Sequence, residues 1–245
     1  TSEAEFMRFY EAVMIEFRND IETDRESGRR ATMLNYMAGL SNMGEEVDLT
    51  AEFNTKNGTK YTRNQLLTTY KKDFMAFAIA RIKLDSEKLT ERSAKYHANI
   101  TGYNPIMRFT RKENQRLLML SEFWIDSTTQ VLPWVFDDKE LTIENKELVN
   151  WWQSADKPSA IQITPSILDS TGNAKKAETE VNLPYVLGVL YDRRAMGVQY
   201  QFDYADTTPF NSAGGYWNMY VHSRKNYWNN YTHNGILYIM GEGGE

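Results

Sequence analysis

The chain contains few side chains that could hold a metal ion or act as a nucleophile. It has 3 histidines and no cysteine, so thiolate chemistry and a disulfide framework are both excluded. His222 and His233 are eleven positions apart in a strand-rich region, whereas a helical metal motif places its histidines four positions apart on one face. We therefore interpret these two residues and His97 as surface or packing residues, and we predict no metal site.

Two pairs of adjacent carboxylates, Glu45-Glu46 and Asp137-Asp138, are the remaining candidates for acid–base chemistry. A glycosidase needs two carboxyl groups that face one bond, but adjacent residues of a strand point to opposite faces. The sequence also lacks the glycine-rich phosphate and dinucleotide motifs and the serine nucleophile elbow. We predict no catalytic residue, no cofactor and no enzymatic activity.

Composition and charge are those of a globular protein. The chain has 245 residues, of which 41% are hydrophobic and 25% charged, and its net charge is -5. The negative charge argues against a general nucleic-acid-binding surface. No stretch approaches the roughly 20 apolar residues that cross a bilayer, and no signal peptide opens the chain. We expect a soluble protein, and the start at Thr1 inside a helical pattern leads us to expect an upstream segment.

The C-terminal part of the sequence, residues 181–240, predicts mostly β-sheet. An apolar run over 183–191 predicts a buried strand, and the polar residues 192–197 predict a turn. From residue 198 apolar and polar residues alternate, which is typical of a strand with one wet face. A loop at 211–215 and further strands at 216–220 and 235–240 complete this part of the prediction.

The N-terminal part predicts helices. From Glu3 to about Asp24, apolar residues recur every three or four positions, which predicts a helix with its apolar stripe against the core. The charged residues 23–30 are either a solvated continuation or a break before a second apolar stretch at 31–40. Alternation over 47–53 predicts a half-buried strand, and Thr62 can open the next helix.

The central part holds shorter signals. Buried strands are predicted at 117–120 and 161–164, a capping box at 110–113, a loop at 99–105, and an exposed mobile loop at 169–180. Residues 71–95 are locally basic but carry interleaved carboxylates. We interpret this stretch as a solvated helix face, with a subunit or nucleic-acid contact as the alternative.

Aromatic residues are abundant, with 15 tyrosines, 11 phenylalanines and 6 tryptophans. Many of them fit a core. The remainder favour a large contact surface, because aromatic residues with a polar group are enriched at protein interfaces and also line sugar-binding grooves.

The last part of the sequence resembles that of a known family. An apolar strand, a short DRR turn, an alternating strand, a glycine-rich loop and then GGYWNMYVHSRKNYWNNYTHNGILYIM, with its aromatic YWN strand and Arg224, resemble the C-terminal part of tailed-phage major capsid proteins. The likeness is to the phi-twenty-nine-type podophage shell proteins, which have the Hong Kong ninety-seven capsid fold. It extends over roughly residues 3–240.

The resemblance implies an α+β fold with two domains. A peripheral domain, residues 1–59 and 198–245, would place a long spine helix on an elongated antiparallel sheet that includes 198–240. An axial domain, residues 60–197, would hold a central sheet flanked by helices. The N-terminal arm and extended loop of such proteins have no counterpart in the sequence, and in the family these segments reach over neighbouring subunits.

The function implied by the resemblance is structural. The chain would be the major head protein of a tailed bacteriophage and would assemble with copies of itself, as pentamers and hexamers, into an icosahedral shell around the genome. Scaffolding and portal proteins are further candidate partners, with no specific nucleic-acid recognition and no membrane. The implied location is the virion, assembled in the bacterial host cytoplasm. The alternatives are an encapsulin-like compartment and an aromatic-rich carbohydrate-binding or hydrolytic domain.

Overall fold

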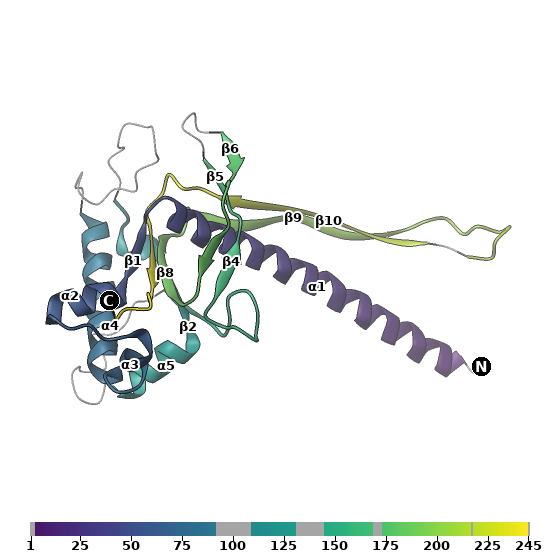
Figure 1. The fold of residues 1–245 in the computed structure, drawn as a ribbon. Helices are drawn as coiled ribbons and strands as arrows, with labels where there is room; N and C mark the ends of the chain where they lie inside the picture. Colours follow the sequence, from purple (N-terminus) through teal and green to yellow (C-terminus); the bar gives the residue numbers. More distant parts are fainter. Residues whose placement is uncertain (1–2, 92–108, 131–144, 169–172, 217, 245) are drawn as a thin grey trace. The chain divides into compact units, whose positions relative to one another are not determined.

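The computed structural model describes residues 3–91, 109–130, 145–168, 173–216 and 218–244. The chain has a mixed α+β fold and divides into two compact units (Figure 1). Unit 1 consists of Thr1–Thr32 and Gly197–Trp228, and unit 2 of Met33–Met196 and Asn229–Glu245. The predicted loop at 99–105 lies outside the described residues, as do His97 and Asp137-Asp138.

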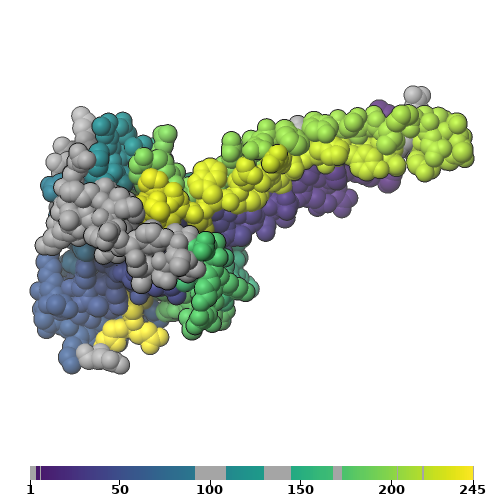
Figure 2. Space-filling view, turned by 90° about the horizontal axis from the view of Figure 1, so that it is seen from above, coloured from purple at the N-terminus to yellow at the C-terminus, as the bar shows by residue number. Residues whose placement is uncertain are grey.

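Unit 1 contains one helix and one hairpin. Most of the helix α1 (Glu3–Asn42) belongs to this unit, and the strands β9 (Met196–Thr207) and β10 (Met219–Asn229) form a two-stranded sheet. The hairpin contacts the helix at residues 24–29, where Lys225 pairs with Asp24 and the Arg29 guanidinium donates to the Tyr200 hydroxyl. Figure 2 shows the purple helix and the yellow-green strands of this unit. The turn between the strands includes residues 211–215, where Asn211 accepts hydrogen bonds from the backbone of Ala213 and Gly214. The predicted loop at 211–215 is confirmed.

Unit 2 is built around a five-stranded sheet in the order β1-β11-β8-β2-β3. Strand β8 lies in the middle, antiparallel to both β11 and β2, whereas β1 and β3 are parallel to their neighbours. The five strands are β1 (Glu46–Asp48), β2 (Gln115–Leu120), β3 (Lys146–Val149), β8 (Val186–Asp192) and β11 (Gly235–Ile239).

Helices and short hairpins complete unit 2. The pairs β4-β7 and β5-β6 form separate antiparallel two-stranded sheets. The remaining elements are α2 (Leu49–Asn57), α3 (Arg63–Leu67), α4 (Lys71–Thr90), the 3-10 helix η2 (Lys112–Asn114), α5 (Ser121–Gln130), β4 (Ile161–Ile163), β5 (Ser166–Leu168), β6 (Ala174–Lys176) and β7 (Val181–Leu183).

The hydrophobic core described by the structure lies entirely in unit 2. Its largest fully buried side chains include Trp152, Tyr36, Tyr238 and Phe74. The indole nitrogen of Trp152 donates to the carbonyl of Val186 at 2.9 Å, so this buried polar group is satisfied by the central strand. Burial raises the pKa of Tyr238, whose hydroxyl lies beneath helix α4.

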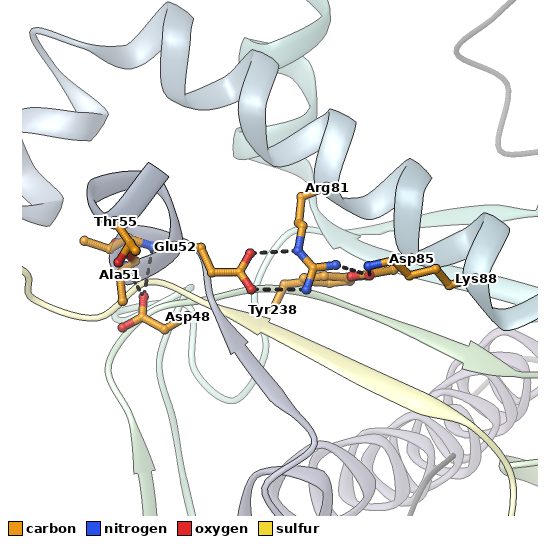
Figure 3. A network of polar contacts seen from close by, with 9 residues as sticks. Asp48, Ala51, Glu52, Thr55, Arg81, Asp85, Lys88 and Tyr238 are labelled. Atoms are coloured by element: carbon orange, nitrogen blue, oxygen red, sulfur yellow. Dashed lines mark hydrogen bonds and ion pairs between the residues drawn. The ribbon is translucent and has the colours of Figure 1, made fainter. Parts of the chain in front are cut away.

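A polar network joins helix α2, helix α4 and strand β11 (Figure 3). The Arg81 guanidinium contacts Glu52 at 2.7 Å and also pairs with Asp85 one turn along α4. Asp85 is nearly buried and accepts a hydrogen bond from the Tyr238 hydroxyl at 3.1 Å. Asp48 caps α2 and also accepts from the backbone of Gly241. These contacts fix the two helices to the last strand, because a buried carboxylate left without its partner would be costly.

Several predicted elements are confirmed. The strand predicted at 183–191 is β8 from Val186 onward, whereas Leu183 ends β7. The strand predicted at 117–120 is β2, and that at 161–164 is β4. Thr62 opens α3 with a complete capping box, in which its side chain and that of Gln65 exchange hydrogen bonds with the backbone. The polar residues 192–197 contain a tight turn, closed by a hydrogen bond from the Ala195 amide to the Asp192 carbonyl.

Other predicted elements are wrong. The strand over 47–53 ends at Asp48, because the Asp48 carboxylate caps α2 and converts the following residues to helix. Residues 110–113 form no capping box and lead into η2 instead. In the loop predicted at 169–180, residues 174–176 instead form strand β6, which pairs with β5, and residues 169–172 lie outside the described residues. Of the two alternatives for residues 23–30, the solvated continuation is confirmed and the break is absent, since α1 is continuous there.

The prediction that 198–240 return to one sheet is also wrong. Strand β11 pairs with β8 and β1 in unit 2, because its nearly continuous apolar sequence suits a strand buried on both faces. Residues 33–59 and 229–245 lie in unit 2, which differs from the expected peripheral domain. The division into peripheral and axial domains refers to the layout of the capsid fold and stays a prediction.

Asp192 forms a buried polar cluster at the end of β8. Its carboxylate accepts hydrogen bonds from the Arg194 guanidinium at 2.8 and 3.0 Å and from the Thr110 hydroxyl at 3.0 Å. The Asn234 amide donates in turn to the same hydroxyl. Burial by itself would raise the pKa of Asp192, but the hydrogen bonds from Arg194 and Thr110 outweigh it, and the pKa lies below its usual value.

Gly188 allows β8 and β2 to approach closely at the centre of the sheet. A Cβ at this position would lie 2.4 Å from the carbonyl oxygen of Leu118. We expect Gly188→Ala to lower the free energy of unfolding by about 1–3 kcal/mol, because backbone atoms must shift to admit the methyl group. Urea unfolding followed by circular dichroism measures this loss.

The matched control is Gly58→Asn. Gly58 ends α2 with φ +63, and nothing lies within 4 Å of the position of its Cβ. Asparagine is tolerated at such positions, so the loss should stay below about 1 kcal/mol. Equal losses in the two variants would contradict the close approach at Gly188.

We expect Asp192→Asn to lower the free energy of unfolding at pH 7 by about 1.5–3 kcal/mol, through loss of charge-assisted hydrogen bonds. The folded-state pKa of Asp192 lies below its unfolded value, so its stabilisation is complete above about pH 4 and is lost as the pH falls through the folded-state pKa. The difference between wild type and variant should therefore narrow below about pH 4. Denaturant midpoints between pH 3 and 7 test this, with exposed Asp156→Asn as the control.

Candidate subunit interface

Unit 1 carries most of the exposed large apolar side chains of the described chain. Among the described residues, fourteen of the seventeen large apolar side chains that are exposed belong to it. The three in unit 2 are Leu84, Ile125 and Leu148. The fourteen in unit 1 are Met7, Phe9, Tyr10, Val13, Ile15, Phe17, Phe202, Tyr204, Phe210, Tyr216, Met219, Tyr220, Tyr227 and Trp228.

Unit 1 has no buried core of its own among its described residues. Every described side chain in it is exposed or half-buried, whereas all the described buried apolar residues belong to unit 2. Single exposed apolar residues are common on protein surfaces, but a concentration of this kind marks an interaction surface. Unit 1 is therefore the candidate functional site.

Helix α1 stays continuous through its charged middle. Arg30 pairs with Glu26 one turn earlier at 3.0 Å, and Arg25 pairs with Glu22. Gly28 would weaken an isolated helix, but here a Cβ would lie 2.4 Å from the Tyr227 hydroxyl oxygen. Glycine at this position thus lets the hairpin approach the helix.

Charged and aromatic contacts hold the hairpin against α1. The Arg29 guanidinium donates to the Tyr200 hydroxyl at 3.0 Å, and Arg25 and Arg29 lie 5.2 and 5.5 Å from the centre of the Tyr200 ring. Lys225 on β10 forms an ion pair with Asp24. The hydrogen bond to Asp24 raises the pKa of Lys225, so this lysine stays charged. These contacts lie at the C-terminal end of the unit 1 helix.

The first turns of α1 carry an uncovered apolar stripe. In the helix 3.6 residues make one turn, so Phe9, Val13 and Phe17 follow one another on one side. All three are exposed, between 40% and 68%. The half-covered positions Met14 and Ile21 lie on the neighbouring side of the helix. The predicted helix is confirmed, but the prediction that its apolar stripe faces the core is wrong for the described residues.

The same stretch of helix is strongly acidic. Between Glu3 and Asp24 the sequence has seven carboxylates and two arginines, a net charge of -5 that equals the net charge of the whole chain. Among these, Glu16 and Asp20 follow Val13 and Phe17 by three positions and therefore border the stripe. The acidic residues beside the apolar stripe were the available signal in the sequence that the stripe is exposed.

The hairpin carries a second uncovered surface, an aromatic patch of Phe202, Tyr204, Tyr220 and His222. The Tyr204 ring stacks on the His222 imidazole with 4.8 Å between centroids and lies 5.6 Å from Phe202. Tyr220 is 6.4 Å from His222, so the rings continue across both strands. The three large apolar members are about half exposed. Exposed aromatic side chains that gather in this way are typical of contact surfaces.

The residues considered for chemistry lie apart. His222 belongs to the aromatic patch, and His233 is a half-buried residue of unit 2. Glu46 accepts a hydrogen bond from the Ser41 hydroxyl at 2.6 Å. In the described part of the chain, no group of three or more His, Cys, Asp or Glu side chains could hold a metal ion. The described helices include none that is both long and apolar enough to cross a membrane.

No family model matches the chain, and no curated protein matches its sequence. Solved structures do match. A chain in the capsid structure of Staphylococcus phage Andhra aligns with a TM-score of 0.53 and 10% sequence identity. A chain in the structure of the head fiber and inner core protein gp22 of bacteriophage P68 aligns with a TM-score of 0.55 and 9% identity.

Each alignment covers 98% of this chain but 66% and 65% of the two phage chains, slightly less than two thirds of their length. The structural similarity therefore extends over nearly all of this chain, although the aligned sequences share few identical residues. The chain has an α+β fold similar to that of chains in these two phage structures.

Proposed function

We propose that the chain is a structural subunit of the head of a tailed bacteriophage and assembles with copies of itself into a closed shell around the genome. The observation that carries this proposal is the uncovered apolar surface of unit 1, where fourteen large apolar side chains are exposed and no described residue is buried. Burial of such surface is the main driving force of protein association. The similarity of fold to chains in phage structures supports the same role.

The role is physical rather than catalytic. Many modest contacts between identical subunits, repeated with closed symmetry, give a stable assembly without a strong single contact. The Hong Kong ninety-seven layout, assembly through pentamers and hexamers, participation of scaffolding and portal proteins, and assembly in the host cytoplasm belong to this proposal. A net charge of -5 fits a shell that does not bind its DNA tightly, because such binding needs a surplus of lysine and arginine.

Purified protein examined by negative-stain microscopy and sedimentation should contain shells, tubes or rings. The triple variant Phe9→Ser, Val13→Ser, Phe17→Ser should lose these assemblies and sediment as a monomer. Its free energy of unfolding as a monomer should change by less than about 1 kcal/mol, because the three side chains are already exposed.

The matched control is Leu84→Ser, which removes an apolar side chain of similar exposure, 50%, from unit 2. This variant should assemble as the wild type does. A wild-type protein that stays monomeric at every concentration would contradict the proposed function. Equal loss of assembly in the control would contradict the special role of unit 1.

A further inference from the structure

We propose that the apolar stripe of α1 in one copy packs against the aromatic patch of the β9-β10 hairpin in a second copy. This contact rests on the proposed function and specifies which surfaces of unit 1 meet. The stripe consists of Phe9, Val13 and Phe17, and the patch of Phe202, Tyr204, Tyr220 and His222.

The two surfaces match in kind. The stripe follows one side of a helix and the patch spans two strands of a sheet, and a helix stripe against a sheet is a standard way to bury apolar surface. Both are uncovered in the described chain, and both belong to the unit that lacks buried residues. One contact between copies would cover both surfaces.

The charge of the helix disfavours the simplest alternative, a symmetric pairing of two α1 helices. Such a pair would bring together two segments that each carry a net charge of -5. The hairpin residues 197–228 instead carry two carboxylates and two cations, so their net charge is zero. Arg224 follows His222 by two positions on β10 and so shares its face of the strand, beside the patch.

The acidic residues that border the stripe and Arg224 beside the patch carry opposite charges. Glu16 and Asp20 flank the stripe on α1, whereas Arg224 flanks the patch on β10. Opposite charges around an apolar centre favour one orientation of the contact and disfavour others. A contact between different surfaces of identical subunits is head-to-tail, and repeated copies can then close into rings.

The absence of cysteine makes a direct test possible, since any introduced thiol is unique in the chain. Four single variants would be prepared in the whole chain. Two are helix variants, Val13→Cys and Phe17→Cys, and two are hairpin variants, Tyr204→Cys and Tyr220→Cys. All four positions are exposed, so the substitutions leave the core unchanged, and thermal unfolding verifies this. Each helix variant is mixed with each hairpin variant under assembly conditions and oxidised or treated with a short thiol cross-linker.

Cross-linked dimers on a non-reducing gel are expected in at least one helix–hairpin mixture. The helix variants alone should give none, and neither should Val13→Cys mixed with Leu84→Cys, a control of similar exposure in unit 2. Cross-links in the Val13→Cys protein alone would show symmetric helix pairing and overturn the inference. Monomers in all four mixtures would also overturn it.

A second measurement tests the contact without thiols. The double variant Tyr204→Ser, Tyr220→Ser should weaken association by at least about tenfold, since aromatic side chains dominate interface energies. Microscopy of the same samples separates the two proposals. Shells that form without helix–hairpin cross-links overturn this contact and leave the proposed function standing, whereas a wild type that never assembles counts against the proposed function itself.

Discussion

Apolar side chains are stabilised by removal from water, and the two units differ in how far they achieve it. Unit 2 meets it internally, with Trp152, Tyr36 and Tyr238 buried around the five-stranded sheet. The central strand β8 is covered by neighbours on both edges, and Gly188 permits the closest approach. Unit 1 has the same kinds of side chain, and none of those that the structure describes is buried. The free energy that would stabilise a core is left available for contacts with other molecules.

Local patterns predicted the elements that depend on local physics. The apolar run of β8 and β2 and the capping box at Thr62 could be recognised from residue types and spacing alone. The strand prediction over 47–53 was wrong because the Asp48 carboxylate caps helix α2. The alternation of apolar and polar residues does not indicate such a cap. The sheet predicted for β11 was wrong for a different reason. The partner of a strand depends on packing between residues far apart in the sequence.

The candidate site was predictable in part. The periodicity of Phe9, Val13 and Phe17 correctly indicated a helix with one apolar side. The assumption that such a side faces a core holds for most isolated domains, but here Phe9, Val13 and Phe17 are exposed. The acidic residues Glu16 and Asp20 beside the stripe were the available hint, because charges bordering an apolar strip are typical of exposed contact surfaces. The aromatic patch needed the pairing of β9 with β10, which residue types alone do not give.

The length and continuity of α1 restrict how this sequence can change. Thirty of its helical residues lie in unit 1, a rigid rod of roughly 45 Å. Phe17 and Arg25 lie on this one rod, so inserting or deleting a single residue between them would rotate the stripe by about 100° relative to the contacts with Tyr200. Substitutions can accumulate along this helix while its residue count stays fixed. Related chains of very low identity should therefore differ in this segment by exchange of side chains and seldom by a gap.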